Sequence, residues 1–226
     1  MQRREFMRYK SVFDIIGPVM IGPSSSHTAG AARIGRVART IFGVQPESVI
    51  ISLYGSFAET YKGHGTDVAL VGGLLDFDTS DTRIPLSLKL AKAANMNVTF
   101  IEEEAISDHP NTARLQLKAG EKEMEIVGIS IGGGTIQIVE LNGFKLNLSG
   151  MNPAILVVHN DRYGSIAGVT NLLTKYHVNI GHMEVSRKEK GKVALMAIET
   201  DENISDEVIE EIKGLPNVLQ VTRMID

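Results

Sequence analysis

"AILVVHNDRYGSIAGVTNLLTKYH", residues 154–177, places an apolar run of strand length directly before a stretch with helical periodicity. The rest of the C-terminal third predicts a hairpin with strands at 178–188 and 192–200, a helix at 205–214 and a last strand at 218–225. The hairpin turns at "EKG", residues 189–191. The resulting order is βαββαβ, the split arrangement of ferredoxin-like domains.

The N-terminal two-thirds predicts a mixed α/β domain. The elements are expected to be a helix from Ser26 or Thr28 to Gly43, a strand at 48–56, a helix at 65–77, a strand at 96–103, and strands across 112–143 with turns at 119–120 and 132–134. Gly150 and Pro153 interrupt the pattern between the two regions. The fold class is therefore expected to be α+β, with one domain at 1–150 and a second at 151–226.

Composition excludes several classes of function. The net charge of −4 and the pI near 5.9 offer no sustained basic surface for nucleic acid. The sequence contains no cysteine, which excludes disulfides, a cysteine nucleophile and thiolate ligands for zinc or iron within this chain. The basic first ten residues lack a following apolar region, and no apolar run reaches the ~18 residues of a membrane span. We expect a cytoplasmic protein without a membrane partner.

A cluster of hydroxyl groups surrounds one imidazole at the start of the first expected helix. A helix N-terminus exposes unpaired N–H groups and favours anions, and hydroxyl side chains there either cap the helix or hold an anionic ligand. More hydroxyls are present than a cap requires: Ser24, Ser25, Ser26 and Thr28. His27 lies among them and is either a general base or a surface histidine.

Three further stretches carry polar groups, and two of them also carry glycines. In "YGSFAETYKGHGTD", residues 54–67, glycines bracket Lys62 and His64. "SDHPNTA", residues 107–113, presents Asn111 and Thr112, and "SIGGGTI", residues 130–136, contains three successive glycines. The glycines of the first and third stretches are consistent with close approach of the backbone to a ligand, and the polar side chains of the X-Pro loop at 107–113 are consistent with a binding loop. Each is also consistent with an ordinary connection, a solvated loop or a bulged hairpin.

In the C-terminal region, "VVHNDRYGSI" carries His159 to Gly164 between the first strand and its helix. A glycine at that turn lets an effector's carboxylate meet the helix N-terminus. An ordinary strand-to-helix turn requires a glycine equally well. Both interpretations remain open at this level.

Four motifs in order, "GPSSSHTAGA", "YGSFAETYKGHGTD", "HPNT" and "SIGGG", resemble the β subunit of the bacterial two-subunit, iron–sulfur-dependent L-serine dehydratases. The resemblance covers essentially the whole chain. It implies an allosteric-substrate-binding domain followed by an ACT domain, with a four-iron, four-sulfur cluster held by cysteines of a separate α subunit. The absence of cysteine here agrees with that division.

The resemblance also implies a reaction, the loss of water and then ammonia from L-serine to give pyruvate. That chemistry requires a Lewis acid at the hydroxyl and a base at the Cα proton. We expect His27 and His64 to handle protons. The residues expected to bind the substrate are Ser24, Ser25, Ser26, Thr28, Asn111 and Thr112. The expected partners are the α subunit, L-serine and a second β chain, and no metal ligand is expected in this chain.

The C-terminal region resembles the serine-sensing ACT domain of D-3-phosphoglycerate dehydrogenases. The residues assigned to effector binding on this basis are His159, Asp161, Gly164 and Asn179. Asp161 and Tyr163 depart from that family's pattern, and a carboxylate at this place opposes binding of another carboxylate. A dimerising domain or a cation site is the other possibility.

A second class of function follows from the same relationship, because some D-3-phosphoglycerate dehydrogenases carry a similar first domain. The alternative is a stand-alone amino-acid-sensing regulatory module. A sensor needs hydrogen-bond donors but no base, so the combination of serines with His27 favours the enzyme subunit.

Overall fold

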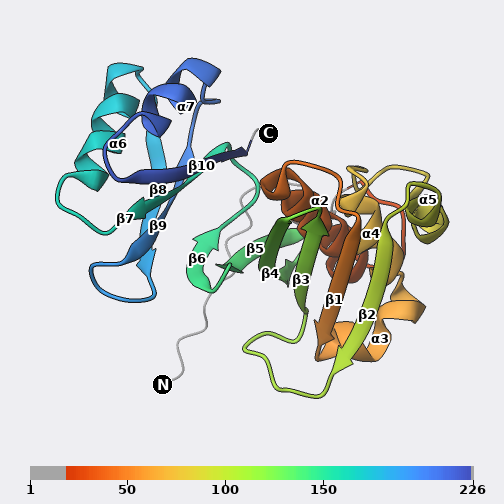
Figure 1. Cartoon of the computed structure of the whole chain (residues 1–226). Helices are drawn as coiled ribbons and strands as arrows, with labels where there is room; N and C mark the ends of the chain where they lie inside the picture. The colour runs from red at the N-terminus through yellow and green to blue at the C-terminus, as the bar shows by residue number, and fades with distance from the viewer. Residues whose placement is uncertain (1–18, 225–226) are drawn as a thin grey trace, which may run out of the picture.

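The structure is a computed structural model that describes residues 19–224, and the expectation that the first ten residues are not a secretory signal lies outside this range. Two sheets organise the chain (Figure 1). The first has the strand order β2-β1-β3-β4-β5-β6 and the second has the order β10-β7-β9-β8. Within residues 19–224, no helix is long and apolar enough to cross a membrane.

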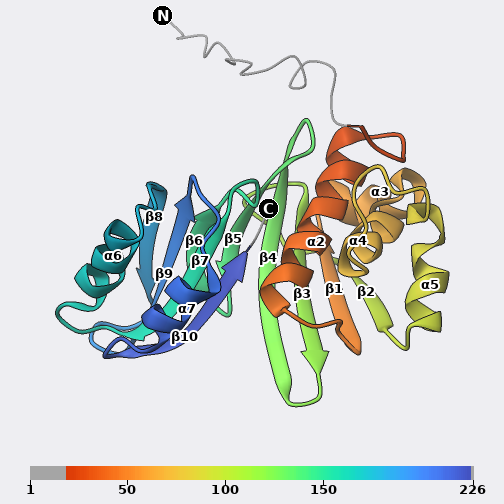
Figure 2. The same cartoon turned by 90° about the horizontal axis from the view of Figure 1, so that it is seen from above.

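Helices cover one face of the first sheet (Figures 1 and 2). The strands of this sheet are β1 (Ser48–Tyr54), β2 (Asn97–Glu103), β3 (Thr112–Ala119), β4 (Lys122–Gly132), β5 (Thr135–Leu141) and β6 (Phe144–Leu148). The helices are η1 (Ser25–Gly30), α2 (Ala31–Phe42), α3 (Ser56–His64), α4 (Thr66–Leu74), η2 (Ile84–Leu86) and α5 (Ser87–Ala93). Alternation along β3 buries Leu115 and Leu117 under the helices, while Gln116 and Lys118 on the opposite face are exposed.

The second half has the βαββαβ order that the sequence predicts, which confirms the expected fold class. Its elements are β7 (Ala154–Asn160), α6 (Ser165–Lys175), β8 (Ile180–Arg187), β9 (Val193–Thr200), α7 (Asp206–Lys213) and β10 (Val218–Met224). The turn between β8 and β9 includes Gly191, whose φ is +76°. Helices α6 and α7 lie on the side of this sheet that faces away from the first sheet (Figure 1).

Both faces of the second sheet are buried, which explains the continuous apolar run at the start of β7. Ile155 and Val157 pack with α6 and α7, whereas Leu156 and Leu195 belong to the core of the N-terminal half. Between the sheets, the buried Glu199 carboxylate accepts hydrogen bonds from the main-chain N–H and the hydroxyl of Ser149, at 2.7 and 2.6 Å. The last strand of the first sheet ends at Leu148 and the first strand of the second begins at Ala154, and the domain boundary near residue 150 stays a prediction.

Two local expectations differ from the structure, and a third is confirmed. The α-helix expected from Ser26 or Thr28 begins at Ala31, because a π-helical segment occupies Ser25–Gly30 before it. The strand expected over 48–56 ends at Tyr54, and the connection that follows is itself helix α3. The expected end of α2 is confirmed, since Gly43 adopts the left-handed conformation with φ +78°.

Candidate active site

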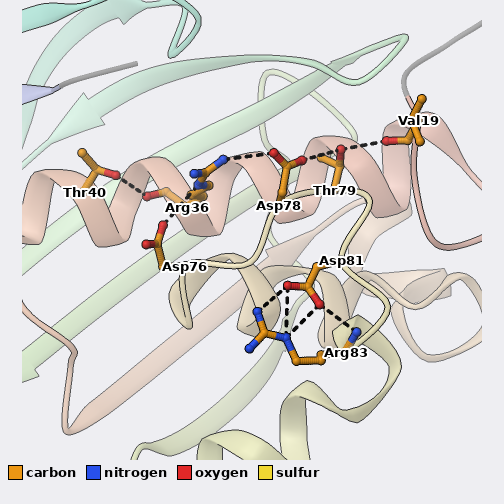
Figure 3. A network of polar contacts seen from close by, with 8 residues as sticks. All are labelled: Val19, Arg36, Thr40, Asp76, Asp78, Thr79, Asp81 and Arg83. Carbon is orange, nitrogen blue, oxygen red and sulfur yellow. Dashed lines mark hydrogen bonds and ion pairs between the residues drawn. The ribbon is translucent and has the colours of Figure 1, made fainter.

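The chain approaches the π-helix along the loop that follows α4. The main-chain N–H of Ile21 donates to the Thr79 carbonyl at 2.8 Å, and the Thr79 hydroxyl donates to the Val19 carbonyl at 2.9 Å. Figure 3 shows the second of these bonds beside the ion pairs from Arg36 of α2 to Asp76 and Asp78 of the loop. Exposed pairs of this kind contribute little energy, but they hold the loop against α2.

The π-helix η1 turns His27 inward. Ser24 is its N-cap, and the Ser24 hydroxyl accepts a hydrogen bond from the His27 main-chain N–H at 3.1 Å. The wider π-turn brings side chains into positions that an α-turn does not allow, and such turns are frequent at functional sites. Ser24, Ser25, Ser26 and His27 are partly exposed, so solvent or a ligand reaches this turn.

Both ring nitrogens of His27 meet serine hydroxyls. Its Nε2 lies 3.0 Å from the Ser56 Oγ at the start of α3, and its Nδ1 lies 3.4 Å from the Ser24 Oγ. The His64 ring from the end of α3 approaches edge-on, with 4.9 Å between ring centroids, and Phe57 packs at 5.4 Å. The first two motifs, which are far apart in sequence, therefore place their histidines side by side.

The pKa of His27 is lowered below its ordinary value. Burial is the larger cause, and the charge of His64 adds to it, while a hydrogen bond with the main chain of Ser56 acts in the opposite direction. The imidazole therefore remains neutral at pH 7 and keeps a lone pair for accepting a proton.

The third and fourth motifs brace the π-helix from β3 and β4. The Ser130 hydroxyl donates to the Ser26 carbonyl at 2.9 Å, and the Ser130 main-chain N–H donates to the Asn111 carbonyl at 3.0 Å. No space remains between these elements, since a Cβ on Gly30 would lie 2.1 Å from the Ser130 Oγ. The Asn111 Oδ1 is buried and has no hydrogen-bond partner within residues 19–224.

Two of the six predicted substrate-binding side chains are buried and engaged by the main chain. The Thr28 hydroxyl donates to the His64 carbonyl at 3.1 Å, and the Thr112 hydroxyl donates to the His109 carbonyl at 2.6 Å. This placement favours bracing of the site over contact with a ligand. Of the three serines, Ser24 contacts the imidazole, while Ser25 and Ser26 precede it in the π-helix. Asn111 contacts Ser130, whose hydroxyl donates to the Ser26 carbonyl.

Ser56 is the residue of this site that sequence reasoning missed. A glycine followed by a serine at the junction of a strand and a helix is the available signal, and it is easily taken for an ordinary helix cap. Here Gly55, with φ +53° and ψ −128°, forms the junction, and Ser56 begins α3.

The C-terminal effector residues do not gather in one place. His159 is buried, its Nδ1 donates to the Asn160 carbonyl at 2.9 Å, and its Nε2 has no partner in the described part of the chain. The Asp161 carboxylate accepts hydrogen bonds from the Gly191 N–H at 2.9 Å and from Arg187 at 3.0 Å. These two groups, in that order, lower the pKa of Asp161.

Asn179 lies at the opposite end of this sheet. Asn160 pairs with Val193 at the start of β9, whereas Ile180, which follows Asn179, pairs with Thr200 at its end. The Asn179 side chain donates to Asp201 at 2.6 Å. Gly164, with φ +84°, stands before α6 on the side of His159. A ligand within one chain therefore meets either Asn179 or the other three residues.

Ligands for a metal ion are not brought together in residues 19–224. No group of three or more histidine, cysteine, aspartate or glutamate side chains forms there, and the full sequence contains no cysteine. Thiolates hold iron–sulfur clusters, so the donor set of this chain does not fit such a cluster.

Two family models match this chain. The family model "Serine dehydratase beta chain" matches residues 11–140, and the ACT domain model matches residues 154–217. The chain is 62% identical over 220 residues to the probable L-serine dehydratase, beta chain, of Bacillus subtilis (strain 168), which covers 97% of this chain and 100% of that protein.

More distant relatives fall into two groups. The L-serine dehydratase, beta chain, of Peptoniphilus asaccharolyticus is 38% identical over 207 residues, covering 91% of this chain and 93% of that one. A D-3-phosphoglycerate dehydrogenase of Methanocaldococcus jannaschii is 31% identical over 130 residues, covering 57% of this chain and 25% of that protein. The match to the dehydrogenase is thus confined to a part of it.

Proposed function

This chain belongs to the serine dehydratase beta chain family, and on that basis we propose that it is the β subunit of an L-serine dehydratase. Together with an α subunit it converts L-serine to pyruvate and ammonia. The observation that carries the proposal is the neutral, partly exposed imidazole of His27, set among serine hydroxyls and beside a second imidazole.

The reaction removes the Cα proton and the β-hydroxyl of L-serine, which leaves as water. The resulting aminoacrylate becomes an imine, and addition of water then gives pyruvate and ammonia. His27 accepts the Cα proton, because its lowered pKa keeps a lone pair available at neutral pH. The exposed His64, 4.9 Å away between ring centroids, receives or returns a proton and exchanges it with solvent.

The hydroxyls of Ser24, Ser25 and Ser26 hold the carboxylate of the substrate beside His27. Their support is positional, since they precede or begin the π-helix that carries the imidazole and are partly exposed. Asn111 contributes through its contact with Ser130 and through its Oδ1, which has no partner among residues 19–224. Thr28 and Thr112 act as braces.

The iron–sulfur cluster implied by the resemblance does not fit this chain, which offers no thiolate. We assign the cluster to the α subunit, together with the polarisation of the substrate hydroxyl. His27 then faces the α subunit across an interface.

Homodimerisation is also part of the proposal, supported by Met183 and Val185, which are exposed on the edge strand β8. We also propose that the protein is cytoplasmic.

Replacing His64 separates its charge from its role in proton transfer. In His64→Gln, loss of the neighbouring charge raises the pKa of His27 toward its ordinary value, so the acid limb of kcat/KM against pH moves to higher pH. The plateau of kcat/KM at high pH falls by about tenfold or more, because a proton-handling group is lost. Lys62→Gln, an exposed change on the same helix, serves as the control. An unmoved acid limb would contradict this account of the pair.

The proposed function is tested by purification of the tagged chain from its native host under anaerobic conditions. We expect an iron-containing partner to co-purify and the complex to form pyruvate from L-serine. The alternative, a stand-alone amino-acid sensor, predicts binding of L-serine with no partner and no pyruvate. That outcome would replace the enzyme subunit by the regulatory module.

A further inference from the structure

We infer that Ser56 is a positioning residue for His27, whose Nε2 its hydroxyl holds and orients. The contact of 3.0 Å is the shorter of the two that the imidazole makes with serine hydroxyls. Neither the four motifs nor the family comparison assigns a role to this side chain. The inference concerns the same site as the proposed function, and only its kinetic consequence rests on that function.

The backbone fixes Ser56 from both sides. Gly55 connects β1 to α3 in a conformation with φ +53° and ψ −128°, which residues with a side chain rarely adopt. A Cβ at Gly55 would lie 2.8 Å from the Pro110 carbonyl oxygen, and that oxygen accepts the Phe57 N–H at 3.3 Å. Ser56 is thus anchored by the end of a buried strand and by the loop of the third motif.

The two serine contacts of the imidazole are not equivalent. The Ser24 hydroxyl already accepts the His27 main-chain N–H at 3.1 Å, and it lies 3.4 Å from Nδ1. Ser56 has no such competing bond from His27, and its contact to Nε2 is well within hydrogen-bonding distance. When His27 takes up a proton, both ring nitrogens become donors, and Ser56 provides the acceptor for Nε2–H.

The surroundings explain why this acceptor matters. Burial and the facing His64 charge both disfavour the protonated ring, whereas the main chain of Ser56 favours it. The Ser56 hydroxyl, 3.0 Å from Nε2, adds a side-chain acceptor at the same place. His64 comes from the end of α3 and Ser56 from its start, so a single helix supplies both opposing influences. Ser56 therefore fixes the ring orientation and supports the protonated form that a general base must pass through.

The direct test is nuclear magnetic resonance of the full chain labelled with nitrogen-15 at histidine. In Ser56→Ala, we expect a lower pKa for His27 and a changed Nε2 shift, because the acceptor is lost. Ser56→Thr keeps a hydroxyl and should restore both. Thr60→Ala is the matched control, since it removes a hydroxyl that donates to the Ser56 carbonyl at 2.7 Å and leaves the Ser56 hydroxyl in place. An unchanged His27 pKa and shift in a folded Ser56→Ala chain would overturn the inference.

Kinetics of the complex with the α subunit provide the second measurement. Loss of a hydrogen bond to a charged group predicts a fall in kcat of about 10- to 100-fold with little change in KM, and rescue in Ser56→Thr. If the resonances of His27 respond but turnover does not, the positioning inference stands and the role of His27 as the base fails. If turnover falls while the resonances are unchanged, the positioning inference fails.

Discussion

His27→Ala is expected to reduce turnover of the complex by about 10²- to 10⁴-fold, the usual contribution of a general base. The reason is that the neutral imidazole accepts the Cα proton, and Ser24 and Ser56 have no comparable basicity. The fold should be retained, because the ring is partly exposed and leaves no closed cavity. The measurement is pyruvate formation from L-serine under anaerobic conditions, with circular dichroism and thermal unfolding as checks on folding.

A matched control is available in the second half of the chain. His177 is exposed with φ +54°, a conformation that asparagine tolerates, so His177→Asn removes an imidazole without strain. We expect normal turnover for this variant. Near-normal turnover of His27→Ala would remove the imidazole from the reaction and leave only a binding role for the motif.

Gly73→Ala is expected to lower the free energy of unfolding by at least about 3 kcal/mol, at the upper end of the cost of overpacking. Helices α2 and α4 cross at Gly35 and Gly73 with their backbones in contact. A Cβ on Gly73 would lie 2.0 Å from the Ala32 carbonyl oxygen and 2.5 Å from the Arg36 nitrogen. The neighbours are backbone atoms, so they cannot move aside independently of the helix.

Chemical denaturation of Gly73→Ala against Gly63→Ala measures this effect. Gly63 lies in α3, where a Cβ would meet nothing within 4 Å, so alanine there is expected to stabilise by about 0.4–1 kcal/mol. Equal stability of the two variants would show that the helices separate without cost. The close crossing matters for function because α2 continues directly from the π-helix that carries His27.

The C-terminal half could be predicted from the sequence because each element has a strong local signal. The apolar run before Asn160, the glycine turn at Gly191 and the periodic pattern of α7 each define one element. In the N-terminal half, α3 was missed because "SFAETYKGH" has weak helical periodicity and contains Gly63. The five-residue strand β6 was missed because it is short.

The site could be predicted in part for a similar reason. His27 and the hydroxyls around it are adjacent in sequence, whereas the contact with Ser56 depends on how β1 meets α3. The burial of Thr28 and Thr112 depends on tertiary packing, which composition does not reveal. The separation of Asn179 from His159 depends on the register of β8 against β9. A sequence motif does not contain this information, so it treats the two residues as one site.

The central claim is that this chain supplies the base to a reaction centre whose metal belongs to another polypeptide. The most direct measurement mixes wild-type chain with increasing His27→Ala chain against a limiting amount of cluster-bearing α subunit. We predict no turnover by the wild-type chain alone, full turnover with the α subunit, and a fall in proportion to the His27→Ala fraction, since the variant still occupies the partner. Full-rate deamination of L-serine by this chain alone, or turnover that His27→Ala sustains, would contradict the account.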